Sequence, residues 1–220
     1  APATGAVNIV TGAIVENDII LSTAPVSITA GGGALVIDGG VSGDNLIDYA
    51  TMTAVGTAGS ITIKGKTNAI GAAVTLRAAT GITVSSLGTD TPSGNKVDAS
   101  TLTSTDGDIA IDANYANHVT NGAVINAKSG GVKITLTSDT GFANIVSGAT
   151  DTAPNPVSIT AGDGSLMIDG GVSGENLVEY AKLTAGGEGG IITIQGKANG
   201  VGAGATLLAD KYPRTFSAQI

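Results

Sequence analysis

The sequence predicts an all-β protein whose chain winds as a parallel β-helix, or β-solenoid, with an internal duplication; a tandem β-sandwich is the alternative. Three observations favour the solenoid. Residues 26–76 return 131 positions later as residues 157–207, with 33 identities in 51 aligned positions, and a fixed long period is typical of repeat architectures. Glycine recurs beside the ends of apolar runs, where a coil must turn a corner. Four Tyr, two Phe and no Trp suit a thin core of stacked layers.

Short alternating runs of apolar residues occur along the whole chain and predict its strands. Each run is four to six residues long, rich in β-branched residues and bounded by Gly, Asn, Asp or Ser, as is typical of strands. No long stretch with the 3.6-residue period of a helix competes with them. In chain order, the expected strands cover residues 6–10, 18–22, 25–30, 34–38, 60–64, 73–77, 81–85, 108–112, 123–127, 132–137, 157–161, 166–169, 191–195 and 205–209.

Residues 44–53 and their duplicate, 175–184, fit this pattern less well. Leu46, Tyr49 and Ala50 have the i, i+3, i+4 spacing of one helix face, so a short helix is one interpretation. The same segment also alternates as a strand would. We expect an irregular or extended excursion from the coil here.

The duplication divides the chain into four parts. Residues 1–76 hold the first copy of the solenoid repeat, 77–142 the intervening coils and 143–207 the second copy, while 208–220 form a divergent C-terminal cap or docking tail. The match extends back to the segment that begins at Asn8, which faces the one at Asn144 once five residues are dropped.

Composition and charge exclude several classes of protein. A net charge of −8 and a pI near 4.4 disfavour nucleic acid, which requires basic stripes. No run approaches the roughly 20 apolar residues that cross a bilayer, so a membrane-spanning chain is not expected. The start at Ala1, without an initiator Met, fits a mature form that has lost a targeting segment, or a fragment. Together with the absence of Cys, these features predict an extracellular protein of a bacterial cell surface.

An enzyme is not expected. His118 is the only His, and a polar loop or surface position explains it better than a catalytic triad does. Carbohydrate-cleaving solenoids need paired carboxylates, or Ca²⁺ with a basic residue, together with aromatic platforms for sugar rings. The chain has only two Arg, Arg77 and Arg214, and six scattered aromatic residues.

The one candidate metal site is a set of acids that both copies keep at three equivalent places. The acids lie in glycine-rich segments, which suits Ca²⁺ because that ion takes six to eight oxygen ligands at flexible geometry. The spacing resembles the Gly-Gly-x-Gly-x-Asp nonapeptides of Ca²⁺-binding β-rolls, although the third Gly comes one position late. Solvated turn acids that share ancestry are the alternative. The candidate ligands are Asp38, Asp44, Asp48, Asp169, Glu175 and Glu179.

The last ten residues abandon the glycine-punctuated pattern and carry Tyr212, Pro213 and Phe216. An open solenoid end has unpaired strand edges, and a head-to-tail contact that does not close produces a filament. We therefore predict homopolymers in which these three residues contact the neighbouring copy. A tail that folds back as a cap and keeps the chain monomeric is the alternative.

Four segments resemble the shaft repeats of filamentous-haemagglutinin-type bacterial adhesins, and they begin at Gly59, Ala73, Asp106 and Gly130. Composition gives a second, weaker resemblance, to bacterial surface-layer proteins. The first resemblance implies a right-handed parallel β-helix that projects from the cell. The function expected is non-enzymatic: a β-solenoid building block of a surface filament, adhesin shaft or surface layer, with a host or cell-surface glycan as a further partner. A carbohydrate-binding or carbohydrate-cleaving β-helix, tailspike- or lyase-like, is the alternative.

Overall fold

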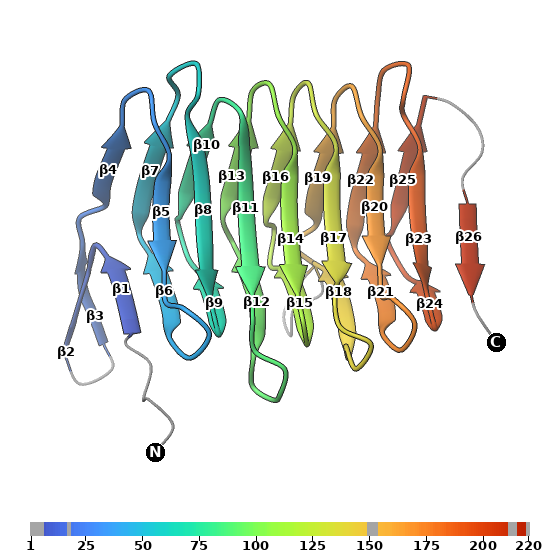
Figure 1. Ribbon diagram of the computed structural model, residues 1–220, viewed down its shortest axis with the longest axis horizontal. Coiled ribbons are helices and arrows are strands. Elements are labelled where there is room, and N and C mark those ends of the chain that lie inside the picture. Colours follow the sequence, from blue (N-terminus) through green and yellow to red (C-terminus); the bar gives the residue numbers. More distant parts are fainter. Residues whose placement is uncertain (1–6, 17–18, 149–153, 211–214, 219–220) are drawn as a thin grey trace.

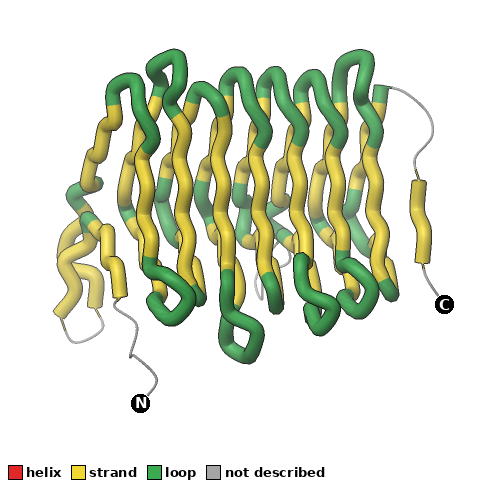
Figure 2. Tube along the Cα trace, in the orientation of Figure 1, coloured by secondary structure: helices red, strands yellow, loops and turns green. Residues whose placement is uncertain are grey.

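The computed structural model describes residues 7–16, 19–148, 154–210 and 215–218, and it is a β-solenoid with three faces (Figure 1). Consecutive strands enter three parallel sheets in turn, and each sheet contains eight strands. The described residues contain strands and loops but no helix (Figure 2). The predicted parallel β-solenoid is therefore confirmed.

The first sheet has the order β1-β6-β9-β12-β15-β18-β21-β24. Every neighbouring pair in it is parallel, so each strand lies one coil further along the rod axis. Its strands are β1 (Val7–Thr11), β6 (Asp44–Asp48), β9 (Thr67–Ile70), β12 (Gly94–Asp98), β15 (Ala116–Thr120), β18 (Ala143–Ser147), β21 (Glu175–Glu179) and β24 (Ala198–Val201).

The second and third sheets follow the first in each coil. The second comprises β4 (Val26–Ala30), β7 (Ala50–Ala54), β10 (Thr75–Ala78), β13 (Thr101–Ser104), β16 (Val124–Ala127), β19 (Val157–Ala161), β22 (Ala181–Ala185) and β25 (Thr206–Ala209). The third comprises β5 (Leu35–Asp38), β8 (Ser60–Gly65), β11 (Gly81–Ser86), β14 (Ile109–Ala113), β17 (Val132–Leu136), β20 (Leu166–Asp169), β23 (Ile192–Gly196) and β26 (Thr215–Ala218). A separate antiparallel hairpin joins β2 (Ala13–Glu16) to β3 (Ile19–Thr23).

The two repeat copies occupy equivalent coils. Strands β4 to β10 correspond to β19 to β25, and β19 lies five strands from β4 in the second sheet. The five residues dropped from the earlier alignment fall in the region of the β2–β3 hairpin, between Asn8 and Val26. The intervening segment 77–142 continues the same winding without a break, so equivalent strands of the two copies lie five coils apart.

The core consists of columns of aliphatic side chains that stack along the rod axis. In the third sheet, Ile61, Ile82 and Ile109 occupy one column, and all are buried. Because β-branched side chains are stiff, identical residues in register fill a narrow interior with little loss of rotamer freedom. This explains how the chain builds a core with so few aromatic residues.

A column of asparagines replaces the aliphatic side chains on the inner side of the first sheet. In each pair of neighbouring coils the Nδ2 group of one Asn donates to Oδ1 of the next, over 2.6 to 2.9 Å. From Asn45 to Asn176, each Nδ2 also donates to a main-chain carbonyl of the third sheet, as from Asn117 to Thr135 over 2.8 Å. These bonds satisfy the buried amides, which would otherwise be costly. The asparagine ladder comprises Asn8, Asn45, Asn68, Asn95, Asn117, Asn144, Asn176 and Asn199.

Each strand expected from the sequence overlaps a strand of the structure, but the expected excursion at 44–53 is wrong. The segment forms β6 and β7, separated by Tyr49 at a φ of 47°. Ile47 and Ala50 both point inward and are fully buried. The spacing of inward residues is thus three across the corner instead of two, whereas Leu46, the first residue of the apparent helix face, points outward and is 37% exposed. The duplicate turns in the same way at Tyr180, with a φ of 44°.

Candidate functional site

An apolar hollow lies on the outer face of the first sheet, over β9, β12 and β15. It has a volume of about 410 Å³. Its floor consists of short side chains, including Ala69, Gly94 and Ala116. Gly94 has a φ of 141°, and a Cβ atom there would lie 2.3 Å from the carbonyl oxygen of Ala116, so this position requires glycine. We call this hollow the first-sheet groove.

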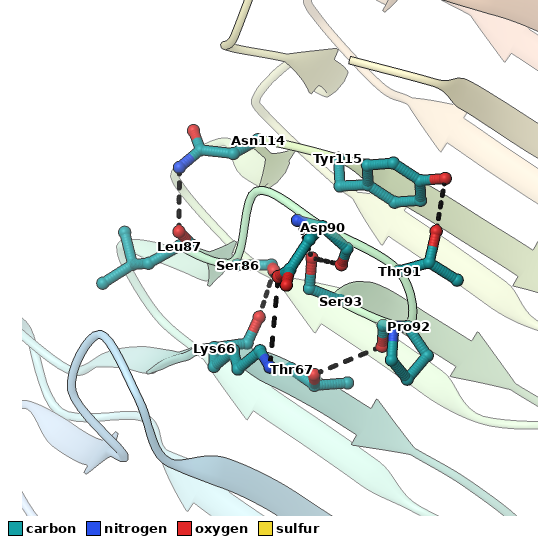
Figure 3. A network of polar contacts seen from close by, with 10 residues as sticks. All are labelled: Lys66, Thr67, Ser86, Leu87, Asp90, Thr91, Pro92, Ser93, Asn114 and Tyr115. Carbon is teal, nitrogen blue, oxygen red and sulfur yellow. Dashed lines mark hydrogen bonds and ion pairs between the residues drawn. The ribbon is translucent and has the colours of Figure 1, made fainter. Parts of the chain in front are cut away.

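The loop of residues 87–93, between β11 and β12, forms one wall of the groove (Figure 3). The amide of Ser93 donates to the carbonyl of Asp90 over 2.6 Å, and the Asp90 amide donates back to Ser93 Oγ over 3.1 Å. Thr91 Oγ1 donates to the hydroxyl of Tyr115 over 2.6 Å. These bonds hold the loop against the next coil, so the wall is preformed.

Two aromatic rings stand at the other side of the groove. Tyr115 and Phe142 occupy adjacent coils, and their rings are stacked with centroids 5.7 Å apart and planes at 11°. Phe142 is 58% exposed. It also lines a second hollow, of about 290 Å³, together with Ile145, Leu177 and neighbouring residues over β18, β21 and β24. The Phe142 ring therefore lies between two parts of one apolar face.

Lys96 and His118 lie side by side at the far end of the groove, because they are register partners on β12 and β15. Lys96 Nζ is 3.2 Å from Asp98 Oδ2. Burial, followed by the positive charge of Lys96, lowers the pKa of His118 below its ordinary value. The imidazole is thus neutral at pH 7, and Lys96 is the cation of the groove.

Two carboxylates near Lys96, Asp98 and Asp48, lie outside the lining of the groove, and their pKa values are shifted in opposite directions. Burial raises the pKa of Asp98, but hydrogen bonds from Thr120, Lys96 and Asn121 outweigh it, so the pKa is lowered. For Asp48, burial dominates and the pKa is raised. Asp98 is therefore held as an anion by its neighbours, whereas Asp48 is the more readily protonated of the two.

Two of the six predicted metal ligands, Asp38 and Asp169, end equivalent strands and cap tight turns. Asp38 Oδ1 accepts from the amide of Gly40 over 2.7 Å, and Asp169 Oδ1 accepts from that of Gly171 over 2.8 Å. Asp169 Oδ2 also accepts from Gln195 Nε2 over 2.8 Å. Each carboxylate thus accepts a hydrogen bond from the amide of the glycine two residues later in its turn.

The other four acids lie at the two ends of first-sheet strands. Asp44 begins β6 and Asp48 ends it, while Glu175 and Glu179 have the same places on β21. Four residues along a strand correspond to about 13 Å, too far for two carboxylates to bind one ion. Over the described ranges, the structure gathers no three His, Cys, Asp or Glu side chains into a group that could hold a metal.

The predicted self-association residues fall mostly outside the described part of the chain. Tyr212 and Pro213 lie in the segment 211–214, which is not described. Phe216 belongs to β26, whose backbone pairs with β23 of the same chain, opposite Ile194. The tail therefore adds a strand to the third sheet of its own solenoid.

Comparison of the chain with protein-family models, with curated proteins and with solved structures finds no match. None of the described segments forms a helix long and apolar enough to cross a membrane.

The groove could not be predicted from the sequence, for two reasons. Tyr115 and Phe142 are separated by a whole coil, so their pairing requires the register of β15 and β18. The strands that carry the groove were also unrecognised, because the inward residues Asn68, Asn95 and Asn117 interrupt the apolar alternation. In each first-sheet strand an Asn is followed two positions later by Val or Ile. This recurring pattern was the signal in the sequence that could have identified these strands.

Proposed function

We propose that this chain is a non-enzymatic structural and adhesive β-solenoid, a rigid segment of a filament, adhesin shaft or surface layer outside a bacterial cell. The observation that carries this proposal is the asparagine ladder, which continues from β1 to β24 with every step hydrogen-bonded. Such continuity serves length and stiffness. Contacts are made only between neighbouring coils, so the rod can be extended by duplicating coils, as the two copies illustrate.

Assembly end to end is part of this proposal. The purified chain should form filaments or ordered sheets in electron micrographs. Deletion of residues 212–220 should abolish them while circular dichroism retains its β signal, if the tail contacts a neighbour. A soluble wild-type monomer that aggregates only after the deletion would instead identify the tail as a cap and contradict the filament.

Ca²⁺ binding at the six acids stays a prediction. If the ion binds the folded form, chelation should lower the melting temperature, because ligands of the native state stabilise it by mass action. Replacing Asp38 and Asp169 with Asn should mimic the chelator. Both carboxylates also accept hydrogen bonds from turn amides, so the double variant could lose stability without any metal being involved. Titration of the wild-type chain with Ca²⁺ by calorimetry measures metal binding directly. No heat and no thermal shift would remove the metal from the proposal.

A second candidate function, carbohydrate binding at the first-sheet groove, is favoured by the stacked Tyr115 and Phe142 rings. Aromatic faces with a nearby polar group are typical of small-molecule sites, and Lys96 supplies a positive charge for an acidic sugar. Binding is proposed instead of cleavage because glycoside hydrolysis needs two carboxylates flanking the bond, and no Asp or Glu is among the described residues that line the first-sheet groove.

A glycan array compared between wild type and Phe142→Ala tests this candidate. Phe142 is 58% exposed, so its removal should weaken sugar binding while its cost to folding is limited to the stacking with Tyr115. Lys96→Gln should discriminate further, since it should reduce binding of acidic sugars more than of neutral ones. Equal binding by wild type and Phe142→Ala would exclude the groove as the sugar site.

A further inference from the structure

The outer face of the second sheet carries two straight columns of hydroxyl side chains over β4, β7, β10 and β13. In the first column Ser27, Thr51, Thr75 and Thr101 are register partners in successive coils. In the second column Thr29, Thr53, Arg77 and Thr103 are partners in the same way. All eight positions are exposed or half-buried, and seven carry a hydroxyl. We call these eight positions the threonine face.

The threonine face differs from the other outer faces in charge. The chain has 18 Asp and Glu, yet none lies among these eight positions. By contrast, the equivalent outer column of the third sheet contains Asp38, Lys64 and Asp112, and that of the first sheet contains Asp48 and Asp98. A face without acids in an acidic protein suits a neutral partner.

The hydroxyls of the threonine face are also unused by the protein. Within the described residues, none of the seven forms a hydrogen bond with another part of the chain, whereas Thr120 Oγ1 elsewhere bonds Asp98 over 2.7 Å. In the six Thr, the methyl and hydroxyl groups are held by a stiff, β-branched χ1 on a regular sheet. The face therefore presents an ordered array of free donors, acceptors and methyl groups.

The spacing of this array can be compared with that of ice. Parallel strands place successive hydroxyls about 4.8 Å apart along the rod and about 6.6 Å apart along each strand. An O–H···O bond of about 2.75 Å in a tetrahedral network gives second-neighbour oxygens about 4.5 Å apart and a repeat of about 7.3 Å along the hexagonal axis. The two sets of spacings agree to within about a tenth in both directions.

We propose that the threonine face binds the surface of ice crystals. A crystalline polysaccharide would present a comparable repeat, but flat sugar rings are recognised by aromatic side chains, and none of the eight positions is aromatic. Methyl groups that order adjacent water and hydroxyls that join the lattice suit ice instead. The proposal adds an activity to the structural rod and does not depend on the first-sheet groove.

Arg77 is the one position of the threonine face without a hydroxyl, and replacing it gives the most direct test of ice binding. The exposed Arg77 side chain projects from the middle of the array. Arg77→Thr completes the second column and should lower the protein concentration that inhibits ice recrystallisation. A gain of activity from removing a charge on one defined face is not expected from a general effect of protein on freezing.

The loss-of-function variant is Thr103→Lys, which places a long side chain on the flat face. We expect it to raise the effective concentration about tenfold, a loss equivalent to about 1.4 kcal/mol of adsorption free energy. Thr83→Lys is the matched control: Thr83 is also half-buried, points outward and occupies a strand centre, but on the third sheet. Circular dichroism of each variant checks the fold.

The measurements are ice recrystallisation in a sucrose solution and adsorption of fluorescently labelled protein to a single ice crystal. Support requires that wild type adsorbs, that Arg77→Thr is more active and that Thr103→Lys is weaker than Thr83→Lys. Equal effects of the two Lys variants, or an inert wild type together with an inert Arg77→Thr, overturn the proposal. Retention on cellulose or chitin without ice adsorption also overturns it and identifies a carbohydrate face.

Discussion

The duplicated coils and the intervening coils have the same backbone fold, but they carry different side chains and loops on their outer surface. Segment 77–142 continues the inner columns of both copies, with Asn95 and Asn117 in the ladder and Ile109 and Ile111 in the core. Outside, it carries the 87–93 loop, Tyr115 and His118, which have no counterpart in the copies. The difference teaches that inward residues specify the coil, while outward residues are free to build sites.

The largest effect should come from breaking the inner column where the two kinds of coil share it. Asn117→Ala removes the acceptor of Asn95, the donor to Asn144 and the donor to the Thr135 carbonyl. Leaving such buried groups unpaired should cost about 3 kcal/mol of unfolding free energy, measured by urea denaturation. Asn126→Ala is the control, since Asn126 points outward. Similar losses for both variants would contradict a special role for the ladder.

Gly94→Ala should have the next largest effect, and it tests a feature that only the intervening coils possess. The added methyl would collide with the Ala116 carbonyl at an unfavourable φ, costing about 2 kcal/mol. Gly33→Ala, in the turn after β4 of the first copy, meets nothing within 4 Å and should leave stability almost unchanged. If the two variants melt at the same temperature, the floor of the groove is more adaptable than its geometry indicates.

Tyr115→Ala should cost less, about 1 kcal/mol, through loss of the stacked ring pair and of the Thr91 hydrogen bond. Tyr115→Phe keeps the ring and should recover most of the stability. The comparison uses urea unfolding of the three chains. A Phe variant as unstable as the Ala variant would assign the effect to the hydroxyl instead of the ring.

The smallest effect concerns pH. Because the pKa of His118 is lowered in the folded chain, the unfolded chain takes up this proton first as the pH falls below about 6.5. Stability should therefore decline from pH 7 toward pH 5, through the folded pKa of His118. His118→Gln should flatten that decline, as monitored by melting temperature. An unchanged slope would show that other groups control it.

The fold was predictable wherever the inward positions are apolar. Ile61 and Ile63 mark β8, and Ile109 and Ile111 mark β14, as alternating runs. First-sheet strands such as β9 and β12 were missed because a buried Asn resembles a loop residue until its ladder partners are known. The segment around Tyr49 was mispredicted because the chain turns a corner there. Across that corner, successive inward residues are three positions apart instead of two.

The candidate site was less predictable than the fold, because it depends on register. Tyr115 meets Phe142, and Lys96 meets His118, only when each coil length is known. Coil lengths vary with their loops, so the pairs cannot be read from a fixed spacing. The acids that the sequence did single out belong to equivalent turns and strand ends, where duplication alone preserves their pattern.

The asparagine ladder also gives the rod a direction, because all of its side-chain hydrogen bonds point the same way along the axis. Each amide donates toward the C-terminal coil and accepts from the N-terminal one, from Asn8 through to Asn199, so the side-chain dipoles add along the axis and polarise one another. The two ends of the ladder are therefore chemically different: the N-terminal end presents an amide acceptor and the C-terminal end an amide donor. Any further coil, whether encoded by duplication or supplied by another molecule, is matched to this direction and must join in the same sense.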